Sequence, residues 1–197
     1  MSRGYAAKRI RERIRTVRLD EAYRLIRRRY QDRPLGTIPT PSRFSDPMGR
    51  YSVLYATQSM QCAVWEGLAR DRFARRRQRI LVFREVEPVV VVTLRSIEPL
   101  SLVDLRHDGP VRIGAPTAVT HDADHRAGRS LSAATYSNVR EADGFVYQSR
   151  FTAHMCMAVF DRAIGKLAVR EVTGLIQHPK FADVLIDYKI TLCSTER

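Results

Sequence analysis

The segment DGFVYQSRFTAHMCMAVF, residues 143–160, contains the pattern that decides the fold of this chain. Asp143 and Gly144 are a turn signal, and the run that follows them, residues 145–149, is rich in aromatic and β-branched side chains. A short polar stretch separates this run from a second apolar run at residues 155–160. Two such runs on either side of a short connection predict a β-hairpin. We therefore expect antiparallel strands in the core.

Further strands and helices are predicted on both sides of the hairpin. The strands are expected at residues 22–26, 51–55, 80–83, 89–92, 100–103 and 167–176, with a last one near Tyr188. The helices are expected over residues 5–19, from Ser59 as the cap through Leu68 into the run 70–79, over 130–140 and near Phe181. Residues 107–128 are predicted to form a long loop. Because strands and helices mix without a regular βαβ repeat, the fold class predicted is α+β.

The length and the charge distribution predict one domain with a basic appendage. The 197 residues carry 34 basic and 21 acidic side chains, a formal net charge of +13 at pH 7. The excess is local, because residues 1–34 hold 12 basic and four acidic side chains and residues 70–79 hold six and one. We expect a basic, helical N-terminal arm over residues 1–20 and a single domain over 21–197 whose body is otherwise neutral.

Several classes of protein are excluded by motifs that the sequence lacks. It contains no glycine-rich dinucleotide-binding motif, no Walker phosphate loop and no GxSxG nucleophile motif. It has no apolar run long enough to span a membrane, and its N-terminus lacks the apolar stretch of a secretion signal. We therefore expect a cytoplasmic protein without a membrane partner.

The signals for disulfides and metals are weak. Cys62, Cys156 and Cys193 are odd in number and lack CxxC spacing, so each is expected to be a small buried apolar residue. His121 and His125 would converge if they lay on one helix, but the composition around them is that of a polar loop. The sequence therefore predicts no metal site.

Five polar residues in apolar or loop contexts are candidates for a functional site: Arg24, Glu66, Arg43, Tyr55 and Ser149. Arg24 interrupts an apolar strand, where a charge is unfavourable unless it is paired, faces a site or points outward. Glu66 is the only acid in an apolar helical stretch, and its alternative role is an ordinary surface ion pair with Arg70, four residues on. The alternative for Arg43 is a solvated loop position. Tyr55 would otherwise be a core residue, and Ser149 a hydroxyl at the end of a strand.

The order of these residues resembles the RES domain family, which is named for its Arg, Glu and Ser. The resemblance is carried by Tyr23-Arg24, Ser42-Arg43-Phe44-Ser45, residues 53–59, Val64-Trp65-Glu66, residues 143–150 and residues 158–161. It spans about Tyr23 to Arg162, and its specificity lies in the ordered set, since no single segment is specific. Many members have Gly-Gly-Arg-Trp-Asn around the second arginine. This chain has Ser42-Arg43-Phe44-Ser45 at that place instead, which affects the shape of the loop that carries Arg43.

The resemblance implies a mixed or antiparallel split β-sheet with flanking helices, similar to ADP-ribosyltransferases. RES proteins are toxins of bacterial toxin–antitoxin pairs that degrade NAD by phosphorolysis or hydrolysis, or transfer ADP-ribose to a protein. Carried over by position, the expected catalytic residues are Glu66, Arg43 and Ser149, and the expected NAD-binding residues are Arg24, Arg43, Tyr55 and Ser149. Whether Ser130 or Ser132 shares the role of Ser149 is left open.

The resemblance also implies a partner, a cognate Xre-like antitoxin with a DNA-binding region and a segment that blocks the NAD site. A protein target of ADP-ribosylation is a further expected partner, and NAD is expected as substrate, without a metal. Planar guanidinium groups suit the pyrophosphate of NAD, and a carboxylate suits the positive charge that develops on the ribose. The acceptor of ADP-ribose is left open among phosphate, water and a protein side chain.

Two other functions compete with NAD cleavage. The first is a basic nucleic-acid-binding module that uses the N-terminal arm and the run 70–79. The neutral body and the lack of a recognisable helix-turn-helix argue against it, so direct nucleic-acid binding is not expected. The second is a noncatalytic interaction protein, which would release no nicotinamide.

Overall fold

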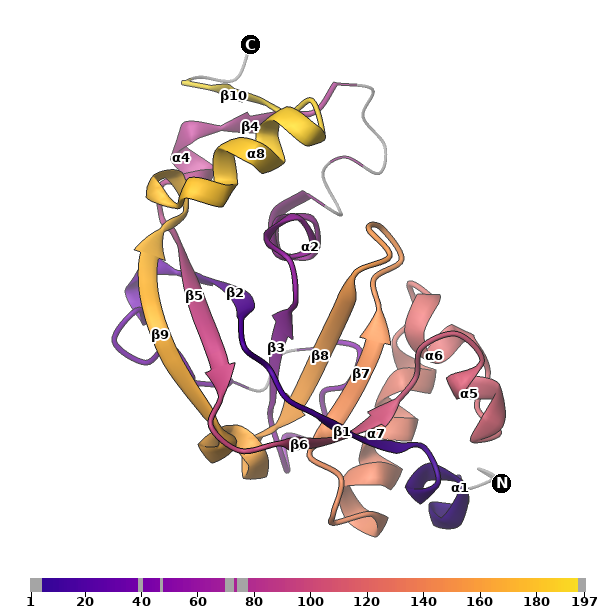
Figure 1. The fold of residues 1–197 in the computed structure, drawn as a ribbon. Helices are drawn as coiled ribbons and strands as arrows, with labels where there is room; N and C mark the ends of the chain where they lie inside the picture. Colours follow the sequence, from indigo (N-terminus) through magenta and orange to yellow (C-terminus); the bar gives the residue numbers. More distant parts are fainter. Residues whose placement is uncertain (1–4, 39–40, 47, 70–72, 74–77, 195–197) are drawn as a thin grey trace.

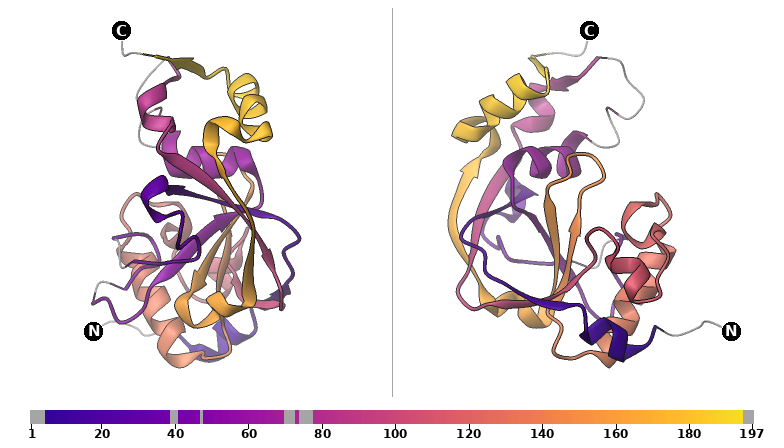
Figure 2. Two further views of the ribbon diagram at one scale, coloured as in Figure 1. Left: turned by 90° about the vertical axis from the view of Figure 1, so that its left-hand side faces the viewer. Right: turned by 45° about the vertical axis from the view of Figure 1, so that its right-hand side comes forward.

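An eight-stranded, strongly twisted sheet forms the centre of the computed structural model, which describes residues 5–38, 41–46, 48–69, 73 and 78–194 (Figures 1 and 2). Its strands are β1 (Ile14–Val17), β2 (Ala22–Arg27), β3 (Val53–Thr57), β5 (Val89–Ser96), β6 (Leu100–Asp104), β7 (Gly144–Gln148), β8 (Met155–Phe160) and β9 (Leu167–Gly174). Their spatial order is β1-β6-β7-β8-β3-β2-β5-β9, and every neighbouring pair is antiparallel except β6 and β7. Strands β4 (Ile80–Val82) and β10 (Thr191–Cys193) form a separate parallel pair.

Helices flank the sheet in two groups. The helices and turns are α1 (Ala7–Arg11), η1 (Arg28–Tyr30), α2 (Met60–Val64), the π-helical turn η2 (Trp65–Ala69), α4 (Phe83–Val86), α5 (Gly109–Arg112), α6 (Ala118–His121), α7 (Arg126–Asn138), η3 (Asp161–Lys166), η4 (Leu175–Gln177) and α8 (Pro179–Asp187). Figure 1 shows α5, α6 and α7 beside β7, whereas α8 and α4 lie with β4 and β10 at the opposite end of the molecule. The predicted α+β class, with a mostly antiparallel sheet and flanking helices, is confirmed.

The apolar patterns of the sequence explain where these strands lie. The valine run Val89–Val92 is buried because β5 lies inside the sheet between β2 and β9. In the predicted hairpin, β7 and β8 pair from Gly144 with Val159 to Gln148 with Met155. Two phenylalanines of this hairpin, Phe145 and Phe160, are fully buried and pack edge to face in the core. The hairpin prediction is therefore confirmed.

The N-terminal segment differs from the helix predicted over residues 5–19. The helix is confined to α1, and residues 14–17 form the edge strand β1, which pairs antiparallel with β6. Ile10 is fully buried in the core cluster that also holds Leu131 of α7. The prediction was wrong because strand pairing with residues nearly 90 positions away competes successfully with the local helical pattern.

The prediction of a long loop over residues 107–128 is also wrong in part, because this stretch contains α5, α6 and the first turn of α7. Pro110 lies in the first turn of α5, where its missing N–H costs no helical hydrogen bond. The last strand begins at Thr191 rather than near Tyr188, which directly follows α8.

The helix predicted from Ser59 is observed as α2 and the π-helical turn η2, and the Ser59 side chain accepts a hydrogen bond from the backbone N–H of Cys62. Its predicted continuation through residues 70–72 and 74–77 lies outside the described residues, as do Arg70 and Pro39. Within the described part of the chain, no helix has both the length and the apolar character needed to cross a membrane.

Candidate functional site

A cavity of about 630 Å³ lies where β2 and β3 meet the π-helical turn η2. The ladder between β2 and β3 consists of one registered pair, Tyr23 with Thr57, and residues of both strands line the cavity beyond it. The volume is typical of a site for a small organic ligand. Four of the five predicted site residues line this cavity: Arg24, Arg43, Tyr55 and Glu66.

The fifth predicted residue, Ser149, binds directly to Glu66. Its hydroxyl Oγ donates a hydrogen bond of 2.7 Å to Oε1 of Glu66, and it accepts one of 3.2 Å from the backbone N–H of Phe151. Ser149 is buried, whereas Glu66 is half-buried and faces the cavity. This contact holds one oxygen of the Glu66 carboxylate, while the side chain still faces the cavity.

The backbone around Glu66 departs from a regular α-helix. Residues 65–69 form a π-helical turn, a local widening of the helix that is frequent at functional sites. Gly67 in this turn approaches β2 so closely that a Cβ atom there would lie 3.2 Å from Cδ1 of Leu25. The turn therefore lies directly against β2, and Glu66 reaches the same cavity as Arg24.

Arg43 is held by the end of helix α6. Its Nη2 donates 2.8 Å to the carbonyl oxygen of Asp122, and its Nη1 donates 3.4 Å to that of Val119. Carbonyls at a helix C-terminus lack partners within the helix and carry partial negative charge, which stabilises a cation. Burial lowers the pKa of Arg43, and the charge of Glu66 opposes that shift. The guanidinium is thus fixed at the cavity wall.

Tyr55 positions the loop that carries Arg43. Its phenol oxygen accepts 2.9 Å from the backbone N–H of Phe44 and lies 2.9 Å from Oγ of Ser42. Nε of Arg129 donates 3.0 Å to the carbonyl of Ser42 from the other side. Burial raises the pKa of Tyr55, so the phenol is neutral at pH 7. Its ring lines the cavity, and its hydroxyl fixes the loop.

Arg24 contacts the chain segment that closes one side of the cavity. Its Nη1 donates 3.1 Å to the carbonyl of Pro34, and its Nη2 donates 2.8 Å to that of Gly36. Burial lowers the pKa of Arg24 to about 10, which leaves the group charged at neutral pH. A guanidinium has five N–H donors, so these two bonds leave donors for a ligand. The charge of Arg24, which is unfavourable within an apolar strand, is therefore stabilised by hydrogen bonds to backbone carbonyls and by its position at the cavity.

The cavity is strongly cationic. The described residues that line it include five arginines and a single acid, Glu66; the arginines are Arg24, Arg27, Arg33, Arg43 and Arg150. The sequence prediction did not assign Arg150 to the site, although it directly follows Ser149. Nη1 of Arg150 donates 3.1 Å to the carbonyl of His121. A wall of this composition favours an anionic ligand such as a phosphate ester.

Tyr147 is a second lining residue that the sequence prediction missed. It is buried, and burial raises its pKa well above the ordinary value. In the sequence it has the pattern of an ordinary core residue of β7, and only its register opposite Cys156 places it at the cavity.

Of the two serines left open, Ser132 is buried and donates 2.7 Å to the carbonyl of Phe44, while Ser130 is exposed. Neither is among the residues that line the cavity.

The prediction that each cysteine is buried is confirmed for Cys62 and Cys156 and is wrong for Cys193. Sγ of Cys62 lies 3.3 Å from Sγ of Cys156. Both are buried, whereas Cys193 in β10 is half-buried. His121 ends α6 and His125 precedes α7, so the two histidines lie at the ends of different helices.

Comparison with known proteins relates this chain to a family model, to a curated relative and to a solved structure. The RES domain family model matches residues 21–182. A curated relative, "Probable toxin y4kH" of Sinorhizobium fredii, is 32% identical over 88 residues, which are 44% of this chain and 69% of the relative. A chain of the MbcT–MbcA toxin–antitoxin complex of M. tuberculosis shares the fold with a TM-score of 0.60 and 14% identity, over 85% of this chain and 90% of that chain.

Proposed function

This chain belongs to the RES domain family, and on that premise we propose that it is the toxin of a toxin–antitoxin pair and acts on NAD. The reaction that we propose cleaves the bond between nicotinamide and ribose and transfers ADP-ribose to phosphate, water or a protein side chain. The observation that most supports this proposal is the shared location of Arg24, Arg43 and Glu66 in one cavity. Three charged side chains that are distant in the sequence thus face one ligand-sized space.

The arginines of the cavity supply the binding energy for the anionic part of NAD. The pyrophosphate carries two negative charges, and guanidinium groups match its oxygens with paired N–H donors. Arg24 and Arg43 are fixed by backbone carbonyls, so their orientation is set before the ligand arrives. Such preorganisation lowers the entropic cost of binding.

Glu66 supplies the negative charge that the reaction requires. Departure of nicotinamide, which leaves as a neutral molecule from its cationic form, develops positive charge on the ribose carbon and ring oxygen. A carboxylate beside the sugar stabilises that charge in the transition state. Because the leaving group is cationic before cleavage, no strong general acid is needed. Ser149 holds the carboxylate through its 2.7 Å hydrogen bond.

We propose a DNA-binding antitoxin as the partner, with a segment that covers this cavity. The solved structure with the same fold is described as a toxin–antitoxin complex. A segment that carries carboxylates would match the five arginines of the wall and would exclude NAD by occupying the same space. Antitoxin binding and NAD binding are therefore expected to be mutually exclusive.

The central test is the substitution Glu66→Gln, which keeps the shape of the side chain and removes its charge. We expect it to abolish the loss of NAD while circular dichroism and the melting temperature stay unchanged. The purified protein is incubated with labelled NAD in buffer, with phosphate, and with cell extract, and the labelled products are separated. These arms distinguish hydrolysis, phosphorolysis and transfer to protein.

The matched control is Glu98→Gln, because Glu98 is an exposed acid in the turn between β5 and β6. This control should retain full turnover. Unchanged turnover in Glu66→Gln would remove Glu66 from the mechanism. If the unsubstituted protein released no nicotinamide in any arm, NAD cleavage itself would be refuted.

A further inference from the structure

We propose that Cys62, Cys156 and Glu66 form a binding site for a thiophilic divalent cation such as Zn²⁺, and that the bound cation inhibits the protein. The Sγ atoms of the two cysteines and a carboxylate oxygen of Glu66 all lie within 4.8 Å of one another. The inhibitory part of the proposal rests on the proposed role of Glu66 in NAD cleavage, whereas the cation site itself does not.

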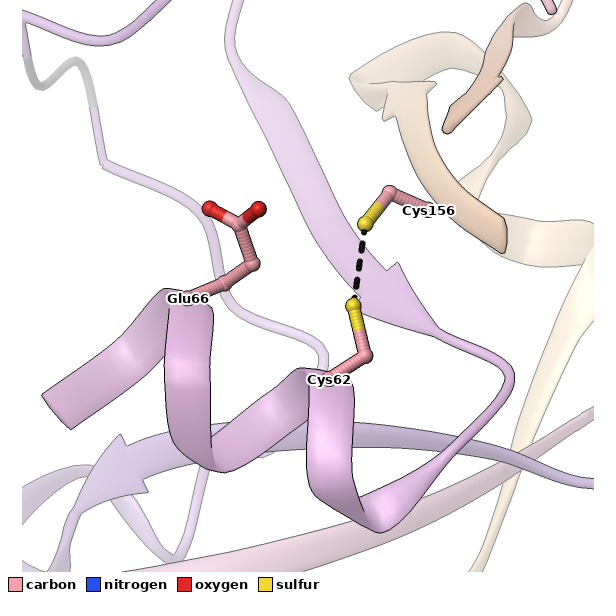
Figure 3. Close-up of side chains that lie close together, drawn as sticks. All are labelled: Cys62, Glu66 and Cys156. Carbon is pink, nitrogen blue, oxygen red and sulfur yellow. Dashed lines mark hydrogen bonds between the residues drawn. The ribbon is translucent and has the colours of Figure 1, made fainter. Parts of the chain in front are cut away.

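The fold brings three ligand atoms, from α2, η2 and β8, close together (Figure 3). Cys62 in α2 and Glu66 in the π-helical turn are four residues apart and therefore lie on the same side of the helix. Cys156 faces them from strand β8, with its Sγ 3.3 Å from that of Cys62. Two thiolates bound to one tetrahedral zinc ion are about 3.8 Å apart, so a shift of roughly half an ångström suffices.

The donor set is selective for soft cations. Two thiolates and one carboxylate are ligands for Zn²⁺ or Cd²⁺, whereas Mg²⁺ and Ca²⁺ require oxygen ligands. Binding converts two thiols to thiolates and releases their two protons to the solvent. Three protein ligands leave a fourth coordination position for water.

The cavity provides the path by which a cation reaches this site. Glu66 and Cys156 both line the cavity, and the fully buried Cys62 lies next to Cys156 with the two Sγ atoms 3.3 Å apart. A cation that binds Glu66 occupies a carboxylate oxygen and competes with the hydrogen bond from Ser149. The coordinated carboxylate is then held toward the two cysteines and is not free to face the ribose, so turnover stops.

The test measures cation binding directly, on full-length protein kept reduced by a phosphine. Zinc affinity is determined by competition with a chromophoric chelator, and Co²⁺ is added as a spectroscopic probe. We expect one cation per chain and a sulfur-to-cobalt charge-transfer band in the near ultraviolet. Cys62→Ser and Cys156→Ser should each weaken zinc binding by more than about 100-fold, because loss of a direct ligand costs more than loss of an outer contact.

The matched control is Cys193→Ser, because Cys193 lies in the separate two-stranded sheet and is half-buried. It should bind zinc and give the cobalt band like the unsubstituted protein. Cys62→Ala, which introduces no new hydroxyl, is the second variant in case Cys62→Ser unfolds. Absence of zinc binding by the reduced protein, or binding that Cys62→Ser and Cys62→Ala leave unchanged, would overturn the cation site.

The inhibitory part is tested by NAD turnover at fixed concentrations of free zinc. Turnover of the unsubstituted protein and of Cys193→Ser should fall with zinc occupancy, and turnover of Cys62→Ser should not. Full turnover by zinc-saturated protein would refute inhibition. Turnover that is absent before zinc is added would refute the proposed function instead, while the cobalt band would still establish the cation site.

Discussion

At the scale of single residues, the contact between Ser149 and Glu66 joins two parts of the chain that are 83 positions apart. Ser149 follows β7 at the start of the hairpin loop, and Glu66 lies in the π-helical turn after α2. The hydrogen bond requires that this hairpin and the helix pack against each other. We therefore propose that Ser149 positions the carboxylate of Glu66.

The substitution Ser149→Ala tests this role. A hydrogen bond to a charged group contributes about 1.5–3 kcal/mol, which corresponds to a fall in kcat of roughly tenfold to a hundredfold. We expect KM for NAD to change little, because the arginines that we propose to bind the pyrophosphate are untouched. Steady-state kinetics of nicotinamide release measure both constants.

Two further variants separate positioning from general destabilisation. Ser149→Thr retains a hydroxyl and should recover most of kcat, whereas Ser130→Ala removes an exposed hydroxyl of α7 and should have no effect. An unchanged kcat in Ser149→Ala would show that Glu66 does not depend on this hydrogen bond.

At the scale of elements, helix α7 packs unusually close to the loop that carries Arg43. A Cβ atom on Gly128 would lie 2.6 Å from the carbonyl oxygen of Arg43 and 3.2 Å from that of Val119. Both atoms belong to the backbone and cannot rotate away. The absence of a side chain at Gly128 thus sets the distance between α7, α6 and the cavity wall.

We expect Gly128→Ala to weaken NAD binding and to lower the melting temperature. Helix propensity alone would favour alanine by about 1 kcal/mol, but the contact with the backbone of Arg43 reverses the sign. A displaced Arg43 should raise KM for NAD by about tenfold or more. Gly165→Ala is the control, since a Cβ there meets nothing within 4 Å. Equal KM values for the two variants would contradict the proposed role of α7.

At the scale of the whole molecule, the N-terminal segment is part of the sheet and the core. Strand β1 covers the edge of β6, and Ile10 of α1 is fully buried against the cluster that holds Leu131. Two of its arginines form ion pairs with acids of the body: Arg11 with Glu141 at 2.5 Å and Arg13 with Asp104 at 3.7 Å. Part of the positive charge of the predicted basic arm is therefore paired with acids of the body.

The substitution Ile10→Ala measures how far this segment stabilises the fold. Removal of a fully buried isoleucine side chain should lower the free energy of unfolding by about 2–5 kcal/mol. Urea denaturation followed by circular dichroism measures this loss. Ile186→Ala is the control, because Ile186 is 73% exposed and should change stability by no more than about 0.5 kcal/mol. A similar small effect of Ile10→Ala would mean that the N-terminal segment is dispensable.

The features that follow from neighbouring residues were determined by the sequence itself. The β7–β8 hairpin, the buried strand β5 and the cap at Ser59 depend on side-chain periodicity and turn residues, which are local properties. The ordered resemblance to RES proteins selected five residues, four of which line the cavity while the fifth binds Glu66. Their roles in NAD cleavage remain predictions for the experiments above.

Tertiary structure alone decided which groups these residues contact. Arg24 and Arg43 are held by backbone carbonyls, β1 pairs with β6, and Cys62 meets Cys156 from 94 positions away. Local periodicity carries no information on such contacts, because they form only when the whole chain closes around its core. The physical reason is that long-range pairing depends on the balance between loop-closure entropy and burial over the entire fold.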